Sequence, residues 1–184
     1  MEVVTTVIPG CLLLRAPVHA DERGVFVKTF HRQQFGALGL NTEWPEEFFT
    51  VSRQGVLRGL HFQRPPHDHA KMVCCLHGRI LDVVVDLRRG SPAFGQHQLF
   101  ELDAARGESV YLPAGLAHGF LALTDGALVA YRVGSVHAPA YDTGIRWDSA
   151  GIPWPAGEKI VSARDRAFPT LAEFDSPFTF EGAA

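Results

Sequence analysis

Cysteine is scarce in this sequence, and neither sign of charge dominates it. Among 184 residues there are three cysteines, and 17 basic residues nearly balance 20 acidic ones. Three is an odd number and too few for a disulfide framework. We therefore expect Cys11, Cys74 and Cys75 to be buried reduced thiols of a cytoplasmic protein. A formal net charge of −3 gives no case for a nucleic-acid partner.

Long apolar runs are lacking as well. No stretch approaches the roughly 18–20 apolar residues that cross a bilayer, so no membrane partner is expected. The short apolar segment 11–14 is preceded by the acidic Glu2 and by no basic region, which argues against a signal peptide. The remaining composition, 46% hydrophobic and 20% charged, is ordinary for a globular protein. We expect one domain, residues 1–184, that folds without a disulfide or a metal.

Alternation with a period of two is the main secondary-structure signal. Within residues 79–87 the odd positions from 81 onward are apolar, whereas Asp82 and Asp86 occupy even positions, which predicts a strand with one face in the core. Further β-like runs are residues 25–30, 51–57, 71–76, 98–102, 109–112, 119–123 and 127–133. Glycine-rich turns separate these runs, so the pattern favours a sandwich or barrel. Short helical turns are expected at 32–38 and 170–174, and a loop at 149–159.

Two histidine motifs resemble those of the cupin superfamily of jelly-roll β-sandwiches. Gly107, Pro113, Gly115 and His118 have the spacing of the second cupin motif, and residues 67–69, His-Asp-His, resemble the start of the first. Metal-binding cupins add an acidic ligand soon after the two histidines. Here Ala-Lys-Met-Val-Cys follows, so no metal is expected.

A longer block is far more specific. Residues 57–63 read Leu-Arg-Gly-Leu-His-Phe-Gln, and Pro65-Pro66, Lys71 and residues 82–88, Asp-Val-Val-Val-Asp-Leu-Arg, follow in order. With residues 21–26 and 144–148, this block resembles the dTDP-4-dehydrorhamnose 3,5-epimerases over about residues 10–175. The resemblance implies an all-β cupin-type jelly roll with short peripheral helices. It also implies cofactor-free epimerisation at C3 and/or C5 of a nucleoside-diphosphate 4-keto-6-deoxy sugar.

The resemblance also implies roles for individual residues. His61 matches the general base, Asp165 its partner carboxylate, and Lys71 the lysine that faces the ketone oxygen. Neutral imidazole suits proton abstraction near pH 7, and an ammonium stabilises a developing enolate. The residues expected to bind substrate are Arg23, Phe26, Lys28, Glu46, Phe48, Arg58, His118 and Tyr131.

The sequence departs from the family at the proton donor. The family's tyrosine, two residues before a proline, aligns with His137, while Tyr131 matches a different tyrosine on the preceding strand. Because imidazole reaches less far than a phenol, we predict inversion of one carbon, preferentially C3. Lys28, Glu46 and Phe48 also differ from the family, which leaves the nucleotide and the sugar open.

Two other functions stay open at this point. One is a metal-dependent cupin oxygenase or isomerase that uses His67, His69 and His118. The other is a cupin that binds sugar nucleotides without catalysis. The resemblance further implies a homodimer with exchanged N-terminal strands.

Overall fold

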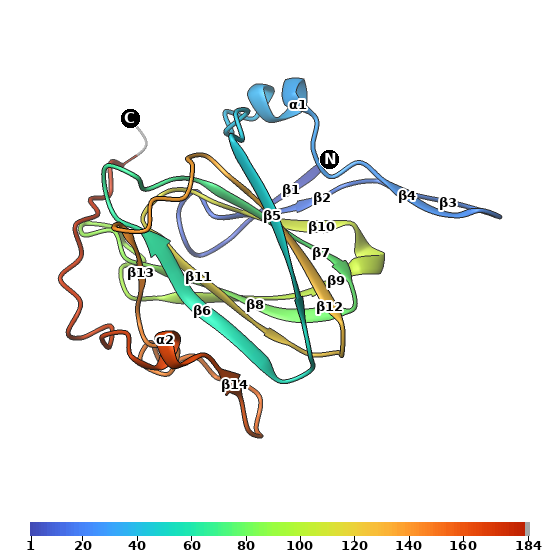
Figure 1. Ribbon diagram of the computed structural model, residues 1–184. Coiled ribbons are helices and arrows are strands. Elements are labelled where there is room, and N and C mark those ends of the chain that lie inside the picture. The colour runs from blue at the N-terminus through green and yellow to red at the C-terminus, as the bar shows by residue number, and fades with distance from the viewer. Residues whose placement is uncertain (183–184) are drawn as a thin grey trace.

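Two β-sheets face one another in the computed structural model, which describes residues 1–182 (Figure 1). The first sheet has the order β1 (Glu2–Thr5), β2 (Leu12–Arg15), β10 (Glu108–Leu112), β7 (Lys71–His77), β12 (Ala127–Val133), β5 (Glu46–Ser52). The second has the order β13 (Asp142–Gly144), β6 (Val56–Gln63), β11 (Leu116–Ala122), β8 (Arg79–Asp86), β9 (His97–Asp103). Neighbours within each list are antiparallel, and the short β14 (Ile160–Val161) runs parallel to β6. The expected all-β sandwich is confirmed.

The main core lies between the sheets, where side chains such as Val73, Val84 and Phe120 are almost fully buried. Strand β8 differs from the prediction, because both of its faces are buried rather than one. Its odd-numbered residues, such as Val83 and Val85, pack in a second cluster with Phe178 from the C-terminal segment. That segment, red in Figure 1, runs along the outside of the second sheet and buries the outer face of β8.

Some elements were predicted and others were not. Strands β1, β2 and β13 and the strand at Val18–Asp21 were missed, and the run 25–30 is a strand only to Val27. The structure has α1 (Arg32–Ala37) where a helical turn was expected, and a loop over residues 149–159. The run 51–57 is not one strand, because β5 ends and β6 begins inside it. Gly55 between them has φ of +81°, which turns the chain. Apolar alternation continues on both sides of this turn, so periodicity alone did not reveal it. The short helices α2 (Ala163–Arg166) and η1 (Ala104–Arg106) were not predicted.

A hairpin projects from the sandwich as an arm (Figure 1). It consists of β3 (Val18–Asp21) and β4 (Gly24–Val27), which within the described part of the chain pair only with each other. Seven of its eight strand residues are exposed, including Val25 and Phe26 at 64% and 60%. Among residues 1–182, no helix has the length and apolar character needed to cross a membrane.

Candidate active site

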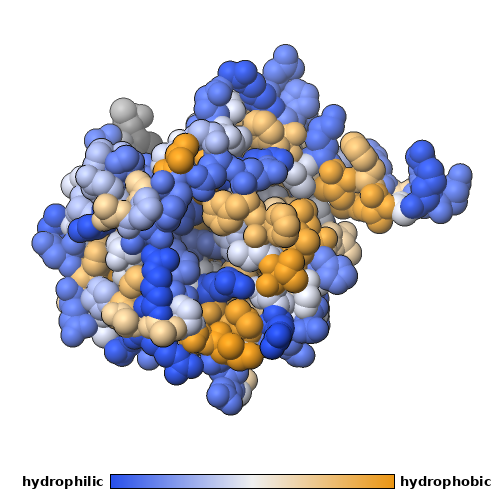
Figure 2. Space-filling model, in the orientation of Figure 1, coloured by the Kyte–Doolittle hydropathy of each residue, from blue (hydrophilic) through white to orange (hydrophobic). Residues whose placement is uncertain are grey.

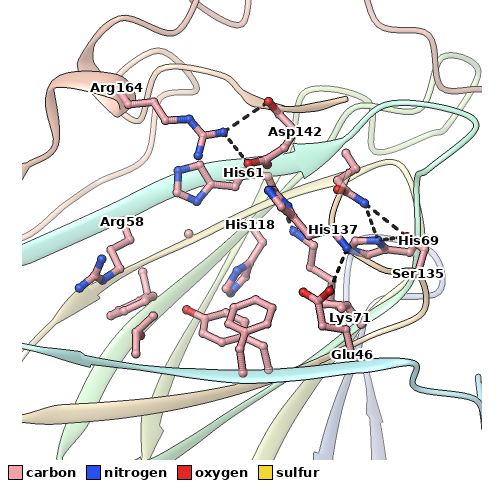
Figure 3. A pocket seen from close by; sticks show the side chains of 17 residues that line it. Glu46, Arg58, His61, His69, Lys71, His118, Ser135, His137, Asp142 and Arg164 are labelled. Carbon is pink, nitrogen blue, oxygen red and sulfur yellow. Dashed lines mark hydrogen bonds and ion pairs between the residues drawn. The ribbon is translucent and has the colours of Figure 1, made fainter. Parts of the chain in front are cut away.

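A cavity of about 370 Å³ opens between the two sheets (Figure 3), within the usual size range of small-molecule sites. Strands β5, β7 and β12 form one wall, and β6 and β11 form the other. Of the residues expected in the site, the following line it: Glu46, Phe48, Arg58, His61, Lys71, His118, Tyr131 and His137. Residues from across the sequence therefore meet in one pocket.

His61 on β6 is anchored by Asp165 on α2. The His61 Nε2 and Asp165 Oδ1 atoms are 2.9 Å apart, and the Asp165 side chain is 6% exposed. The Ser162 hydroxyl caps α2 by accepting a hydrogen bond from the Asp165 N–H, which fixes the carboxylate's position. Burial raises the pKa of Asp165, but hydrogen bonds from His61 and the Gly59 N–H outweigh it and bring the pKa below its usual value. An ionised carboxylate therefore orients the imidazole.

Gly59 allows the backbone contact that places this pair. Its φ is +134°, and a Cβ there would lie 2.6 Å from the Gly119 Cα on β11. The β6–β11 register also shifts between His118 and Phe120. Only glycine fits this close approach, in which the Gly59 N–H donates to Asp165 Oδ2 at 3.1 Å. The Arg-Gly-Leu-His segment thus combines a special backbone with the candidate base.

Lys71, at the start of β7, is held beside His61. Its Nζ donates a hydrogen bond to the His61 carbonyl oxygen at 3.2 Å. Burial lowers the pKa of Lys71 from its usual value to about 8, and only Asp142 acts in the opposite direction. The ammonium has further N–H donors to offer a ligand in the pocket.

A second histidine–carboxylate pair consists of His118, which lines the pocket, and the buried Asp82 behind it. His118 Nε2 is 2.7 Å from Asp82 Oδ2, and both side chains are buried. Among the described residues 1–182, the other Asp82 oxygen has no hydrogen-bond partner. Burial raises the pKa of Asp82, whereas His118 lowers it, with a net rise. The sequence periodicity predicted that the polar residues of β8, Asp82 among them, face away from the core. Asp82 is instead fully buried, because its carboxylate binds His118.

Tyr131 on β12 faces the pocket from the wall opposite His61. The Phe48 ring stacks on it at 4.7 Å between centroids and 15° between planes, and the His118 ring meets it edge-on at 5.9 Å. Burial is the main cause that raises the pKa of Tyr131 above its ordinary value, and Asp82 raises it further. The phenol is therefore protonated at neutral pH.

Sequence reasoning missed a hydrogen-bonded cluster in the wall beside Lys71. Gln63 donates to the His67 carbonyl and accepts from the Ala138 N–H, at 2.9 and 2.6 Å. His69 Nδ1 lies 2.6 Å from the Ser135 hydroxyl. Burial, with Lys71 nearby, lowers the pKa of His69 to about 4, so this ring is neutral. The cluster holds the loop that carries His137.

Two carboxylates that line the pocket contact residues distant from them in the sequence (Figure 3). Glu46 accepts a hydrogen bond from the His137 N–H at 2.9 Å, and Asp142 pairs with Arg164 at 2.7 Å. Asp142 and Arg164 were not predicted as site residues. The available signal was that Arg164 belongs, with Ser162 and Asp165, to a segment that matches the family.

Three expected substrate-binding residues lie outside this pocket. Arg23 and Phe26 are on the projecting arm, and Lys28 follows it. Arg23 pairs with Asp21 on the arm itself. A single chain therefore does not bring these side chains to its own His61.

The histidines of the metal-site alternative do not converge. Within residues 1–182, no group of three or more His, Cys, Asp and Glu side chains is arranged to hold a metal ion. The His67 ring packs at a tilt against Tyr141, with 4.4 Å between ring centroids, whereas His118 is hydrogen-bonded to Asp82. The three cysteines are free and buried, as expected.

The sandwich and its pocket of histidine, carboxylate, lysine and tyrosine define a cupin-type enzyme with acid–base side chains. The family model of dTDP-4-dehydrorhamnose 3,5-epimerase matches residues 5–173. The chain belongs to the dTDP-4-dehydrorhamnose 3,5-epimerase family and is an isomerase of nucleotide-sugar metabolism. The fold and the activity implied by the sequence motifs are thereby confirmed.

Individual relatives cover nearly the whole chain. A dTDP-4-dehydrorhamnose 3,5-epimerase of Methanothermobacter thermautotrophicus is 38% identical over 92% of this chain and 94% of its own. The Legionella pneumophila enzyme RmlC, solved with dTDP-4-keto-L-rhamnose, superposes with a TM-score of 0.93 at 31% identity, covering 98% of this chain and 99% of RmlC. ChmJ, a 3'-monoepimerase of Streptomyces bikiniensis, was solved as a double mutant with dTDP. It superposes with a TM-score of 0.87 at 37% identity, covering 91% of this chain and 86% of ChmJ.

Proposed function

We propose that this pocket epimerises a dTDP-linked 4-keto-6-deoxy sugar, with His61 as the base and Tyr131 as the proton donor. The observation that carries the proposal is their placement. His61 comes from β6 and Tyr131 from β12, so they face the cavity from opposite sheets. Inversion of a carbon requires proton removal on one face and delivery on the other, which two walls can provide.

The first half of the reaction uses His61 and Asp165. Because Nε2 faces Asp165, it carries the hydrogen, and Nδ1 keeps the lone pair that accepts a proton from the sugar. The electrons of the broken C–H bond move toward the ketone and form an enolate. The ionised Asp165 stabilises the imidazolium that results. The ketone itself is the electron sink, so the residues present suffice without a cofactor.

The enolate oxygen is the group that Lys71 is suited to hold. An ammonium in a half-buried wall stabilises negative charge more strongly than it would in water. Lys71 lies against the strand that carries His61, so the charge forms next to the base that created it.

The second half requires an acid, and we assign it to Tyr131 rather than to His137. In the ChmJ double mutant the replaced histidine and tyrosine are 70 residues apart, and His61 and Tyr131 have the same separation. A protonated phenol can give its proton to the enolate carbon and recover it from solvent. With a tyrosine as donor, the reason for expecting inversion of C3 alone no longer applies.

A homodimer would complete the site. A lone two-stranded hairpin is marginally stable in water, yet the β3–β4 arm exposes Val25 and Phe26. Figure 2 shows further apolar surface at the arm and over the front of the sandwich, where Phe49 and Val51 of the edge strand β5 are exposed. We propose that the arm packs on a second copy and carries Arg23 and Lys28 to its pocket. Arg23 would then join Arg58 of that copy in holding the diphosphate.

We propose that the enzyme works in the cytoplasm, where the reducing environment keeps its three cysteines free.

The function is tested by deuterium uptake from solvent. A binder without catalysis leaves C3 and C5 of a 4-keto sugar unlabelled.

The pKa of Lys71 predicts an alkaline limit to activity. The ammonium form is the useful one, so kcat should fall as pH rises through about 8, where Lys71 loses its charge. In Lys71→Arg the residual activity should lack this decline, because a guanidinium stays charged above pH 12. A wild-type kcat that stays constant to pH 10 would contradict the role of Lys71.

Chelation should leave the rate unchanged. Prolonged incubation with EDTA is expected to preserve epimerisation, since Lys71 places a cation in the pocket where an acidic metal ligand would be needed. Loss of activity that iron, manganese or zinc restores would instead support the metal-dependent alternative.

A further inference from the structure

The Tyr131 ring is enclosed between two other rings. Tyr131 and Phe48 are directly opposed on the adjacent strands β12 and β5, and their rings are almost parallel. His118 meets the Tyr131 ring edge-on. Tyr131 is 7% exposed, whereas Phe48 is 43% exposed. Phe48 is therefore the outer layer of this stack, on the edge strand of its sheet.

We propose that Phe48 is a positioning residue that fixes the Tyr131 ring and shields its hydroxyl from water. The proposal rests on the proposed role of Tyr131 as proton donor. It gives Phe48 a role through Tyr131, in place of the direct substrate contact expected from the sequence.

The physical reason is the short reach of a proton transfer. A donor must approach the carbon within about 2.6–3.2 Å, so a small rotation of the tyrosine ring removes the contact. Stacking restrains that rotation, and aromatic pairs contribute beyond their buried area. Without the restraint, water can reach the enolate and protonate it from either side, which separates proton exchange from inversion.

The ionisation of the Tyr131 hydroxyl depends on how well its surroundings, including the Phe48 ring, exclude water. Burial is the largest cause that raises the pKa of Tyr131, and the buried Asp82 adds to it. The Thr50 hydroxyl and Arg58 act in the opposite direction. His118, held by Asp82, faces the same ring. Opening the Phe48 side to water should therefore bring the Tyr131 pKa down toward the ordinary value of about 10.

The test compares Phe48→Ala with Phe94→Ala. Phe94 is 49% exposed in the turn between β8 and β9 and does not line the pocket, so it controls for loss of an exposed ring. Each variant is assayed on dTDP-4-keto-6-deoxyglucose for kcat, KM and the ratio of deuterium exchange to inversion. Phenol ionisation is followed by ultraviolet absorbance, and Tyr131→Phe identifies the Tyr131 signal among three tyrosines.

For Phe48→Ala we expect kcat to fall about 3- to 10-fold with KM unchanged. Exchange should rise relative to inversion, and Tyr131 should ionise at lower pH. Phe48→Trp, which can stack and adds no ionisable phenol, should restore all three. A rise in KM alone, or a phenol titration equal to that of Phe94→Ala, would overturn the proposal. If wild-type protein shows no exchange at all, the proposed function fails instead, and the phenol titration still reports on Phe48.

Discussion

His61→Asn is expected to lower the rate of C–H exchange at the carbons beside the ketone by about 10²–10⁴-fold. Asparagine preserves the size and polarity of the side chain but cannot accept a proton near pH 7. Asp165 would remain in place, since the Gly59 N–H and Ser162 also bind its segment. Affinity for dTDP should change little, because His61 acts on the sugar. Exchange is measured by NMR in deuterated water, and affinity by calorimetry.

His67→Asn is the matched control for this variant. His67 lies four residues beyond the end of β6 and packs on Tyr141 rather than lining the pocket. It should retain wild-type exchange. If His61→Asn kept more than about a tenth of the wild-type rate, another group would have to be the base.

Tyr131→Phe is expected to lower inversion by a similar factor, about 10²–10⁴-fold, while leaving exchange more active. The variant keeps the ring, and hence the stack with Phe48, but has no proton to give. His61 can still remove the substrate proton and return a solvent-derived one to the same face. Label without inversion is therefore the distinguishing result, read from the coupling pattern of the labelled sugar.

Two further variants separate Tyr131 from its alternatives. Tyr141→Phe removes a phenol that does not line the pocket and should behave as wild type. His137→Gln removes the imidazole that the sequence suggested as donor. If His137→Gln lost inversion and Tyr131→Phe did not, the assignment of the donor to Tyr131 would be wrong.

The base side of the site could be predicted from the sequence because its geometry is local. Arg58, Gly59 and His61 lie on one strand, and the need for glycine at a positive φ makes the segment recognisable. Asp165 lies 104 residues away on the unpredicted helix α2, so only the family resemblance of its segment pointed to it. The alternation of apolar residues likewise predicted β7 to β12, but it missed β1, β2 and β13 and merged β5 with β6.

The donor side depends on how strands from different parts of the chain pair. Tyr131 is defined by its stack with Phe48 and its contact with His118, which come from β5 and β11. No spacing in the sequence reports those contacts, so the sequence favoured His137, which stands closer to the proline. The arm was anticipated only through the family resemblance, which implied exchanged N-terminal strands. The motif that contains Arg23 and Phe26 does not itself show that a hairpin holds them away from their own chain's pocket.

One incubation tests most directly whether this pocket moves protons between the two faces of a sugar. Wild-type protein, without added metal or cofactor, is incubated with dTDP-4-keto-6-deoxyglucose in deuterated water and followed by proton NMR. We predict loss of the C3 or C5 proton signal together with inversion of the labelled carbon, and neither change with His61→Asn. A sugar that stays unlabelled and unchanged in the presence of the wild-type protein would contradict the proposed mechanism.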